Sequence, residues 1–189
     1  MRLRGLKDQI FKWGERLIFA ALLTFALIRL GPQLAAWSGV GPIEGSQPDY
    51  AFVALDATPI SADAMRGKVV VVNLWATWCP PCRIEIPALQ RLHEEFEDRS
   101  DIVVVGLAGD VEGERVVRPF LEERGVTYAN GLLTADLRAA FGGVQGFPTT
   151  LIIGRDGVVR SRVLGFFAPP AMRAAVRRAA AEAFPQLPE

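Results

Sequence analysis

Cys79 and Cys82 are the only cysteines of this 189-residue sequence, and two prolines separate them. A β-branched, hydrophobic stretch precedes the pair and a stretch with helical spacing follows it, which predicts that the pair lies at a helix N-terminus. Free N–H groups and positive potential at that position stabilise a thiolate. Two intervening residues place the second sulfur one turn along, close enough to form a disulfide. We therefore predict a redox-active pair, with Cys79 as the exposed attacking sulfur and Cys82 as the more buried resolving sulfur.

The residues beside the pair are also candidates for the site. Pro80 and Pro81 donate no N–H, and proline is tolerated in the first turn of a helix. They are expected to stiffen the ring between the two sulfurs and to shift its reduction potential. Trp78 is predicted to be exposed as an apolar lip for a substrate, with a core position as the alternative. Alternation along the preceding strand places Trp75 in the core.

Other uses of two cysteines have to be weighed against redox chemistry. A disulfide-stapled secreted scaffold needs more cysteines in a shorter chain. A four-ligand zinc site cannot be built from two cysteines and the single histidine, His93, without a partner chain. His93 is interpreted as a solvated residue on the polar part of a charged helix. A Cu(I) carrier using the same thiolates and a non-catalytic scaffold remain as alternatives to an oxidoreductase, for which neither a metal site nor a cofactor beyond the redox-active disulfide is predicted.

The elements that must position the pair alternate between strands and helices. Two nearly continuous β-branched stretches, residues 69–74 and 102–107, predict strands buried on both faces. Their order along the chain combines parallel βαβ units with a closing antiparallel hairpin, which predicts an α/β sheet with helices on both faces. The other predicted strands are 50–55, 126–129, 149–153 and 158–164, and the predicted helices are 81–96, 113–124, 134–141 and 169–184. Within the helix at 81–96, the spacing puts Ile84 on the apolar side and Glu85 elsewhere.

The N-terminal segment predicts a membrane anchor. Residues 17–28 (LIFAALLTFALI) carry no charge, and residues 1–30 contain six basic and two acidic side chains within a chain of zero net charge. The positive-inside rule keeps the basic tip in the cytoplasm, which places the remainder on the periplasmic side of the inner membrane after a single pass. A cleaved signal peptide or a buried soluble helix is the alternative. The zero net charge argues against nucleic-acid binding.

Domain organisation follows from these patterns. Residues 1–37 are predicted to form the cytoplasmic tip and the anchor. Residues 38–49 (SGVGPIEGSQPD) are rich in Gly, Pro and Ser and are predicted to form a linker. Residues 50–189 are predicted to form the catalytic domain.

The sequence Trp78-Cys79-Pro80-Pro81-Cys82, set between a strand and a helix, resembles the active site of thioredoxin-fold proteins. Pro87 matches the helix-kinking proline of that family, and Gly-Phe-Pro-Thr at 146–149 matches the loop that carries its cis-proline. The resemblance covers roughly residues 46–183 and implies a thioredoxin-like mixed sheet. It also implies that Pro148 is cis, faces the cysteines, and leaves the backbone of Phe147 to pair with an extended substrate peptide. A core-filling role for Phe147 is the alternative.

The sequence is most similar to the membrane-anchored TlpA/ResA-like branch of that family. Its extra N-terminal strands end at Arg66-Gly67-Lys68, a helix is inserted at 113–124, and Asn73 stands where thioredoxins proper carry a buried acid. The resemblance implies an extracytoplasmic thiol–disulfide oxidoreductase, commonly a reductant in cytochrome c maturation or copper-centre assembly. The implied partners are substrate proteins with disulfides or thiols, and a membrane protein that re-reduces the pair.

Two polar residues are predicted as possible proton-transfer groups. Asp110 is the best match for a glutamate that some ResA-like proteins carry after the second central strand, although it is one methylene shorter. A solvated loop aspartate is the alternative for Asp110. Asn73 is expected to lie beneath the cysteines, where it either hydrogen-bonds buried backbone or assists deprotonation of Cys82 through water.

Overall fold

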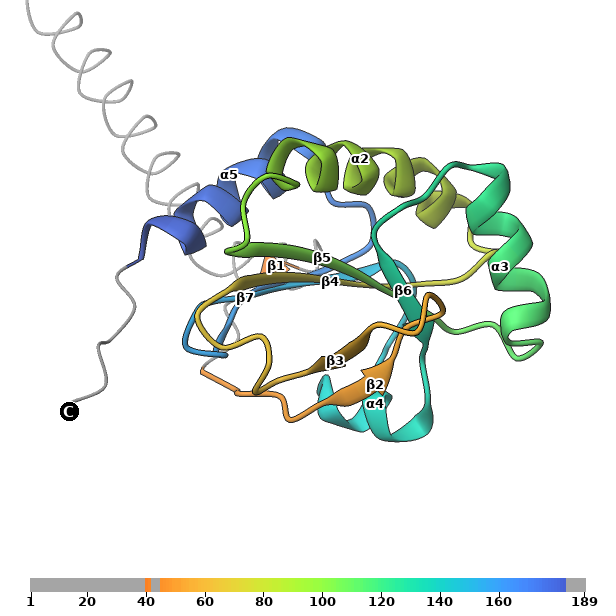
Figure 1. Ribbon diagram of the computed structural model, residues 1–189, viewed down its shortest axis with the longest axis horizontal. Coiled ribbons are helices and arrows are strands. Elements are labelled where there is room, and N and C mark those ends of the chain that lie inside the picture. Colours follow the sequence, from red (N-terminus) through yellow and green to blue (C-terminus); the bar gives the residue numbers. More distant parts are fainter. Residues whose placement is uncertain (1–39, 42–44, 183–189) are drawn as a thin grey trace, which may run out of the picture. The chain divides into compact units, whose positions relative to one another are not determined.

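The computed structural model describes residues 40–41 and 45–182, and their centre is a six-stranded mixed sheet (Figure 1). The three strands β4, β5 and β6 are parallel, whereas β7, β8 and β1 continue the sheet through antiparallel pairs. In spatial order the strands are β1 (Val40–Gly41), β8 (Val159–Leu164), β7 (Thr149–Ile153), β4 (Val69–Trp75), β5 (Ile102–Ala108) and β6 (Ala129–Leu132).

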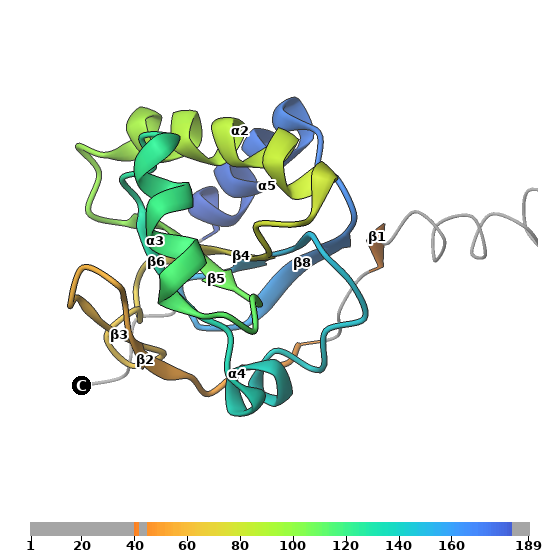
Figure 2. The same cartoon turned by 90° about the vertical axis from the view of Figure 1, so that its right-hand side faces the viewer.

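Helices cover both faces of this sheet (Figures 1 and 2). The helices α2 and α5 pack on one face, and α4 packs on the other together with a separate two-stranded sheet formed by β2 and β3. The remaining helix, α3, packs near the carboxyl end of β4. Their bounds are α2 (Pro80–Phe96), α3 (Glu114–Glu123), α4 (Ala135–Ala140), α5 (Pro169–Ala181), β2 (Ala51–Val53) and β3 (Pro59–Ser61).

The central strand β4 shows why its sequence is hydrophobic without alternation. Val69 and Val71 pack with the residues of α2 and α5, whereas Val70 and Val72 pack with those of α4 and β3. All seven residues of β4 are buried because both faces of the strand are covered. The sheet can therefore hold the segment that follows β4 in a defined position.

The predicted thioredoxin-like sheet, the extra N-terminal strands and the inserted helix are confirmed. The strand predicted at 126–129 is wrong, because β6 begins only at Ala129. Val126 and Tyr128 instead pack on the face that α2 and α5 cover. The predicted anchor lies outside the described residues, among which no helix has the length and apolar character that a membrane crossing requires.

The orientation of α2 differs from its prediction at two neighbouring residues. The sequence pattern puts Ile84 on the apolar side and Glu85 elsewhere, but Ile84 is 67% exposed and Glu85 is 0% exposed. The buried row begins at Cys82 and continues at helical spacing through Glu85 to Leu89 and beyond. Cys82 and Glu85 therefore lie on the same buried face of α2, which brings a carboxyl group into the core.

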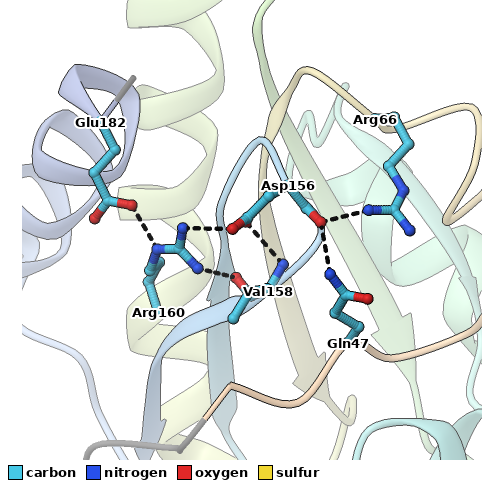
Figure 3. Close-up of polar contacts among 6 residues, drawn as sticks. All are labelled: Gln47, Arg66, Asp156, Val158, Arg160 and Glu182. Atoms are coloured by element: carbon cyan, nitrogen blue, oxygen red, sulfur yellow. Dashed lines mark hydrogen bonds and ion pairs between the residues drawn. The ribbon is translucent and has the colours of Figure 1, made fainter. Parts of the chain in front are cut away.

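Charged groups hold the end of the sheet that lies away from the cysteines. Figure 3 shows the turn between β7 and β8, where the carboxylate of Asp156 accepts from Arg160 at 2.8 Å. Arg160 also donates to Glu182 at 2.5 Å, which ties the turn to the end of α5. The backbone carbonyl of Asp156 accepts from Arg66 at 2.5 Å and from Gln47 at 3.1 Å. These contacts join four segments that are distant in the sequence.

Candidate active site

Cys79 and Cys82 form a disulfide with an S–S distance of 2.04 Å and a Cα–Cα distance of 5.3 Å. The predicted ring between the two sulfurs is therefore confirmed. Cys79 is 3% exposed and Cys82 is 0% exposed, so the order of exposure is as predicted, but Cys79 is not the exposed residue that the sequence suggested. Both cysteines pack in one apolar cluster with Trp75 and Ile86. Access to the pair is limited to a small part of Cys79.

The start of α2 provides a single backbone donor for the sulfur of Cys79. Cys79 is the N-cap residue, and Pro80 and Pro81 occupy the first two positions of the helix without an N–H. The N–H of Cys82 donates to the sulfur of Cys79 at 3.3 Å, and the N–H of Arg83 donates to the carbonyl of Cys79 at 3.2 Å. A thiolate at Cys79 would therefore be stabilised by the N–H of Cys82 and by the positive end of the helix dipole.

The loop before Cys79 is held from two sides at Thr77. Its N–H donates to both carboxylate oxygens of Asp110, at 3.0 and 3.2 Å, and its hydroxyl donates to the same carboxylate. The carbonyl of Thr77 accepts from Nε of Arg83 at 2.6 Å. Asp110 is 8% exposed, so the alternative of a solvated loop aspartate is wrong. Asp110 positions the loop that carries Trp78, and proton transfer by Asp110 stays a prediction.

Two aromatic rings border the cysteine pair. Trp78 is 61% exposed, as predicted, and its ring meets Phe147 edge to face with centroids 5.8 Å apart. Phe147 packs against the cluster that contains both cysteines, so its core-filling alternative holds for part of the ring. The bond from Phe147 to Pro148 is cis, as the resemblance implied. Within the described residues, the backbone of Phe147 has no hydrogen-bond partner.

The two prolines and Pro148 differ in exposure. Pro80 is exposed and Pro81 is half-buried, so both border the surface around Cys79. Pro148 is buried, and its carbonyl accepts from the N–H of Gly165 at 2.8 Å. The loop after β8 is thereby joined to the loop that carries Phe147. The role of all three prolines in substrate binding stays a prediction.

Glu85 is the residue of the site that the sequence analysis missed. It lies one turn after Cys82 and is fully buried. The hydroxyl of Thr150 donates to its Oε1 at 3.0 Å, whereas its Oε2 has no partner among the described residues. Burial raises the pKa of Glu85 to about 7, against the smaller opposite effect of the hydrogen bond from Thr150. The signal in the sequence is its spacing of three residues from Cys82 on the buried row.

Asn73 completes a chain of buried polar groups. It is 1% exposed, and its Nδ2 donates to the hydroxyl oxygen of Thr150 at 2.9 Å. Because Thr150 accepts this bond, its own hydrogen points to Glu85. The expected hydrogen bond from Asn73 to buried backbone is therefore wrong, and the partner is a side chain on the neighbouring strand β7. Asn73 thus orients the group that holds Glu85, and a role for Asn73 in deprotonating Cys82 stays a prediction.

Comparisons with known proteins agree with this geometry. A family model described as the AhpC/TSA family matches residues 43–162, well over half of the chain. The chain belongs to the AhpC/TSA family. Proteins described as thioredoxin-like or of the thioredoxin family are also similar to this chain in sequence and in structure. The sequence resemblance to thioredoxin-fold proteins is therefore confirmed.

Named relatives narrow the activity of this AhpC/TSA-family protein. It is 34% identical to the thioredoxin-like protein YneN of Bacillus subtilis (67% of this chain, 74% of the relative). It is 30% identical to the thiol-disulfide oxidoreductase ResA of Oceanobacillus iheyensis (82% of this chain, 81% of the relative). A solved thiol:disulfide interchange protein from Chlorobium tepidum is 30% identical, with a TM-score of 0.66 over 74% of this chain and 99% of its own. The chain is a thiol–disulfide oxidoreductase.

The surroundings of the pair bear on the alternative of a metal carrier. In the part of the chain that the structure describes, no three His, Cys, Asp or Glu side chains gather as metal ligands would. His93 was predicted to be solvated, but it is half-buried, with its ring edge to face with Tyr128 at 6.2 Å. A Cu(I) ion on the described residues would rest on the two thiolates of Cys79 and Cys82.

Proposed function

We propose that this protein is a membrane-anchored, extracytoplasmic oxidoreductase that reduces disulfides of substrate proteins, of the type used in cytochrome c maturation or copper-centre assembly. One observation carries the proposal. The disulfide of Cys79 and Cys82 lies at the start of α2, beside the unpaired backbone of Phe147 and one turn from the buried carboxyl of Glu85. The anchor and the location are supported by the apolar residues 17–28 and the basic tip before them.

The reaction follows the chemistry of thiol–disulfide exchange. The thiolate of reduced Cys79 attacks one sulfur of a substrate disulfide, that disulfide breaks, and the released substrate thiolate takes up a proton. Cys82 then loses its proton and attacks the sulfur of Cys79. The mixed disulfide breaks, the second substrate sulfur leaves as a thiol, and two electrons have passed from the cysteine pair to the substrate.

The proton of Cys82 needs an acceptor, because both cysteines lie in an apolar cluster. Residues three apart on a helix are neighbours, so the carboxyl of Glu85 lies on the same side of α2 as Cys82. A group with a pKa of about 7 exchanges protons readily near neutral pH. In the proposed mechanism Glu85 accepts the proton of Cys82 and delivers it toward the departing substrate thiolate.

The substrate is held by backbone and by aromatic rings. An extended peptide can pair with the N–H and carbonyl of Phe147, which have no partner in the part of the chain that the structure describes, as in strand addition to a sheet edge. The exposed ring of Trp78 and the half-buried ring of Phe147 offer apolar surface next to the same backbone. These contacts would hold the mixed disulfide until Cys82 attacks.

Continued turnover needs an electron donor. Oxidising compartments outside the cytoplasm keep disulfides intact unless a reductant is supplied. We infer that a membrane protein carries electrons across the bilayer and re-reduces the pair of Cys79 and Cys82.

The reduction potential of the pair tests the direction of electron flow. The protein is equilibrated with thiol–disulfide buffers of known potential, and the reduced fraction is measured by alkylation. A value of about −270 mV, as in thioredoxin, supports a reductant, and a value of about −120 mV, as in DsbA, contradicts it. Absence of exchange together with stoichiometric Cu(I) binding by the reduced protein would favour the metal carrier.

The location has a separate test. A reporter that is active only outside the cytoplasm is fused after Glu189, and a reporter that is active only inside is fused at the same place. The first fusion is expected to be active and the second inactive. The opposite result would contradict the proposed topology while leaving the exchange chemistry untouched.

A further inference from the structure

The guanidinium group of Arg138 lies beside the loop that borders the cysteines. Arg138 belongs to α4 and is half-buried, and its Cζ lies 5.6 Å from the centroid of the Phe147 ring. A Cβ atom added to Gly109 would lie 3.0 Å from Nη2 of Arg138 and 2.4 Å from Cζ of Phe147. The arginine, the aromatic ring and the glycine backbone are therefore packed together, and only glycine at 109 leaves space for this arrangement.

This cation is chemically unsatisfied within the described residues. The guanidinium of Arg138 makes no ion pair or hydrogen bond with any of them. Asp110 follows Gly109, the residue that packs against Arg138, but its carboxylate accepts hydrogen bonds from Thr77 and not from Arg138. Arg83, the other arginine at the site, donates to the carbonyl of Thr77. Of these two arginines, Arg138 is the one whose five N–H donors have no acceptor among the described residues.

We propose that Arg138 binds an acidic side chain of the substrate polypeptide, so that the enzyme prefers disulfides flanked by aspartate or glutamate. This inference rests on the proposed function and names the substrate class for the same site. The guanidinium contacts the ring of Phe147, the residue whose backbone is free to pair with an extended substrate. Side chains next to the reacting substrate cysteine therefore pass within reach of Arg138.

The chemistry of arginine favours a carboxylate as the occupant. Its planar fork of donors matches the two oxygens of a carboxylate, and such pairs are stronger than neutral hydrogen bonds. Partial burial strengthens the attraction further, because the local dielectric is lower than in bulk water. The cation–π contact with Phe147 restricts the guanidinium, so that less rotamer freedom is lost when the substrate binds.

The test compares three peptides that share length and a single internal disulfide. The residues flanking the cysteines are glutamate in the first, glutamine in the second and lysine in the third. Reduced wild-type protein is expected to reduce the glutamate peptide about three- to tenfold faster than the glutamine peptide at low ionic strength. Added salt is expected to lower this ratio.

Variants assign the preference to one residue. Arg138→Gln is expected to bring the ratio to about one, Arg138→Glu to favour the lysine peptide, and Arg138→Lys to keep part of the preference for glutamate. Arg178→Gln is the matched control, because Arg178 is an exposed arginine of α5 without a polar partner among the described residues, and it should keep the wild-type ratio. Circular dichroism establishes that each variant is folded.

A small neutral disulfide, bis(2-hydroxyethyl) disulfide, separates the two proposals. Every variant should reduce it at the wild-type rate, because it carries no charge for Arg138 to bind. If wild-type protein reduces this compound but shows no preference among the peptides, or if Arg138→Gln keeps the preference, the assignment of Arg138 is overturned. If wild-type protein fails to reduce any of the disulfides, the proposed function itself is overturned.

Discussion

Carboxyl groups at the two ends of the sheet are in opposite environments. At the end away from the cysteines, Asp101 accepts from Arg99 at 2.9 Å and from Arg155 at 2.6 Å, and these arginines lower its pKa to about 2. At the end with the cysteines, Glu85 is fully buried, and burial raises its pKa to about 7. One carboxyl group stays ionised and joins segments, whereas the other is poised to exchange a proton. The surroundings decide the role of a carboxyl group.

The arginine side chains at the two ends of the sheet also differ in whether they are paired with carboxylates. Near the turn between β7 and β8, Arg160 is paired with both Asp156 and Glu182 (Figure 3). At the other end, Cζ of Arg138 lies 5.6 Å from the centroid of the Phe147 ring, and its guanidinium has no carboxylate partner among the described residues. Paired charges suit an end that has only to hold the fold. An unpaired cation suits an end that receives another molecule.

Removal of either cysteine thiol should have the largest effect of all on substrate reduction, because both thiols lie at the end of the sheet where exchange takes place. Cys79→Ser is expected to lose exchange entirely, because no sulfur remains to attack the substrate. Cys82→Ser should retain the first attack and accumulate mixed disulfides, because nothing resolves them. Non-reducing gels and mass spectrometry of trapped adducts measure the difference. Equal trapping by both variants, or trapping by Cys79→Ser alone, would show that the assigned roles are inverted.

The buried carboxyl should make stability depend on pH near neutrality. The pKa of Glu85 in the folded protein lies above its ordinary value of 4.5, so the folded state binds more protons than the unfolded state between pH 4.5 and about 7. The free energy of unfolding should therefore fall by about 3 kcal/mol as the pH rises through this window. Urea titrations at several pH values measure it.

The variant Glu85→Gln should remove this pH dependence, because its amide does not titrate. Glu97→Gln is the control, since Glu97 is exposed at the end of the same helix and should leave the slope as in wild type. If the slope persists in Glu85→Gln, another group causes it, and the contrast with Asp101 fails.

Loss of the hydrogen bonds between Thr77 and Asp110 should have an intermediate effect on stability and on substrate reduction. Asp110→Ala removes the acceptor for both the N–H and the hydroxyl of Thr77, which is expected to lower the free energy of unfolding by about 2 kcal/mol. Thr77 should also exchange its amide hydrogen faster, and substrate reduction should slow because the loop to Cys79 is less ordered. Glu112→Ala, at an exposed position nearby, should change stability by less than about 0.5 kcal/mol.

The smallest effect is expected at the far end of the sheet. The pKa of Asp101 lies below its ordinary value of 3.8, so this group stabilises the folded state above about pH 4 and loses that contribution as the pH falls toward 2. Its side chain is 30% exposed, and screening by solvent limits the contribution to about 1 kcal/mol.

Asp101→Asn should therefore lower the free energy of unfolding at pH 7 by about this amount, and added salt should reduce the difference. Asp98→Asn, an exposed neighbour, is the control. An effect on disulfide exchange from Asp101→Asn would contradict the separation between the two ends of the sheet.

Local signals in the sequence predicted the cysteine pair and the exposed ring of Trp78, and the resemblance of residues 146–149 to the thioredoxin-fold loop implied the cis bond before Pro148. Each depends on neighbouring residues: the spacing that closes a ring across one helical turn, the strand that ends before Trp78, and the Gly-Phe-Pro-Thr segment. The order of strands and helices could also be predicted, because β-branched stretches and helical spacing are properties of short sequence segments.

Contacts between segments that are distant in the sequence determined the surroundings of Glu85 and Asp110. Glu85 looks in the sequence like a solvated helix residue, but it lies on the buried face of α2, where the hydroxyl of Thr150 from β7 donates to it. Asp110 looks like a loop aspartate, but the sheet brings it to Thr77. The sequence alone determined which atoms exchange electrons, since that chemistry belongs to one short segment. Only the tertiary structure decided which groups bind protons and present charge around them, because burial and pairing depend on residues brought together by the fold.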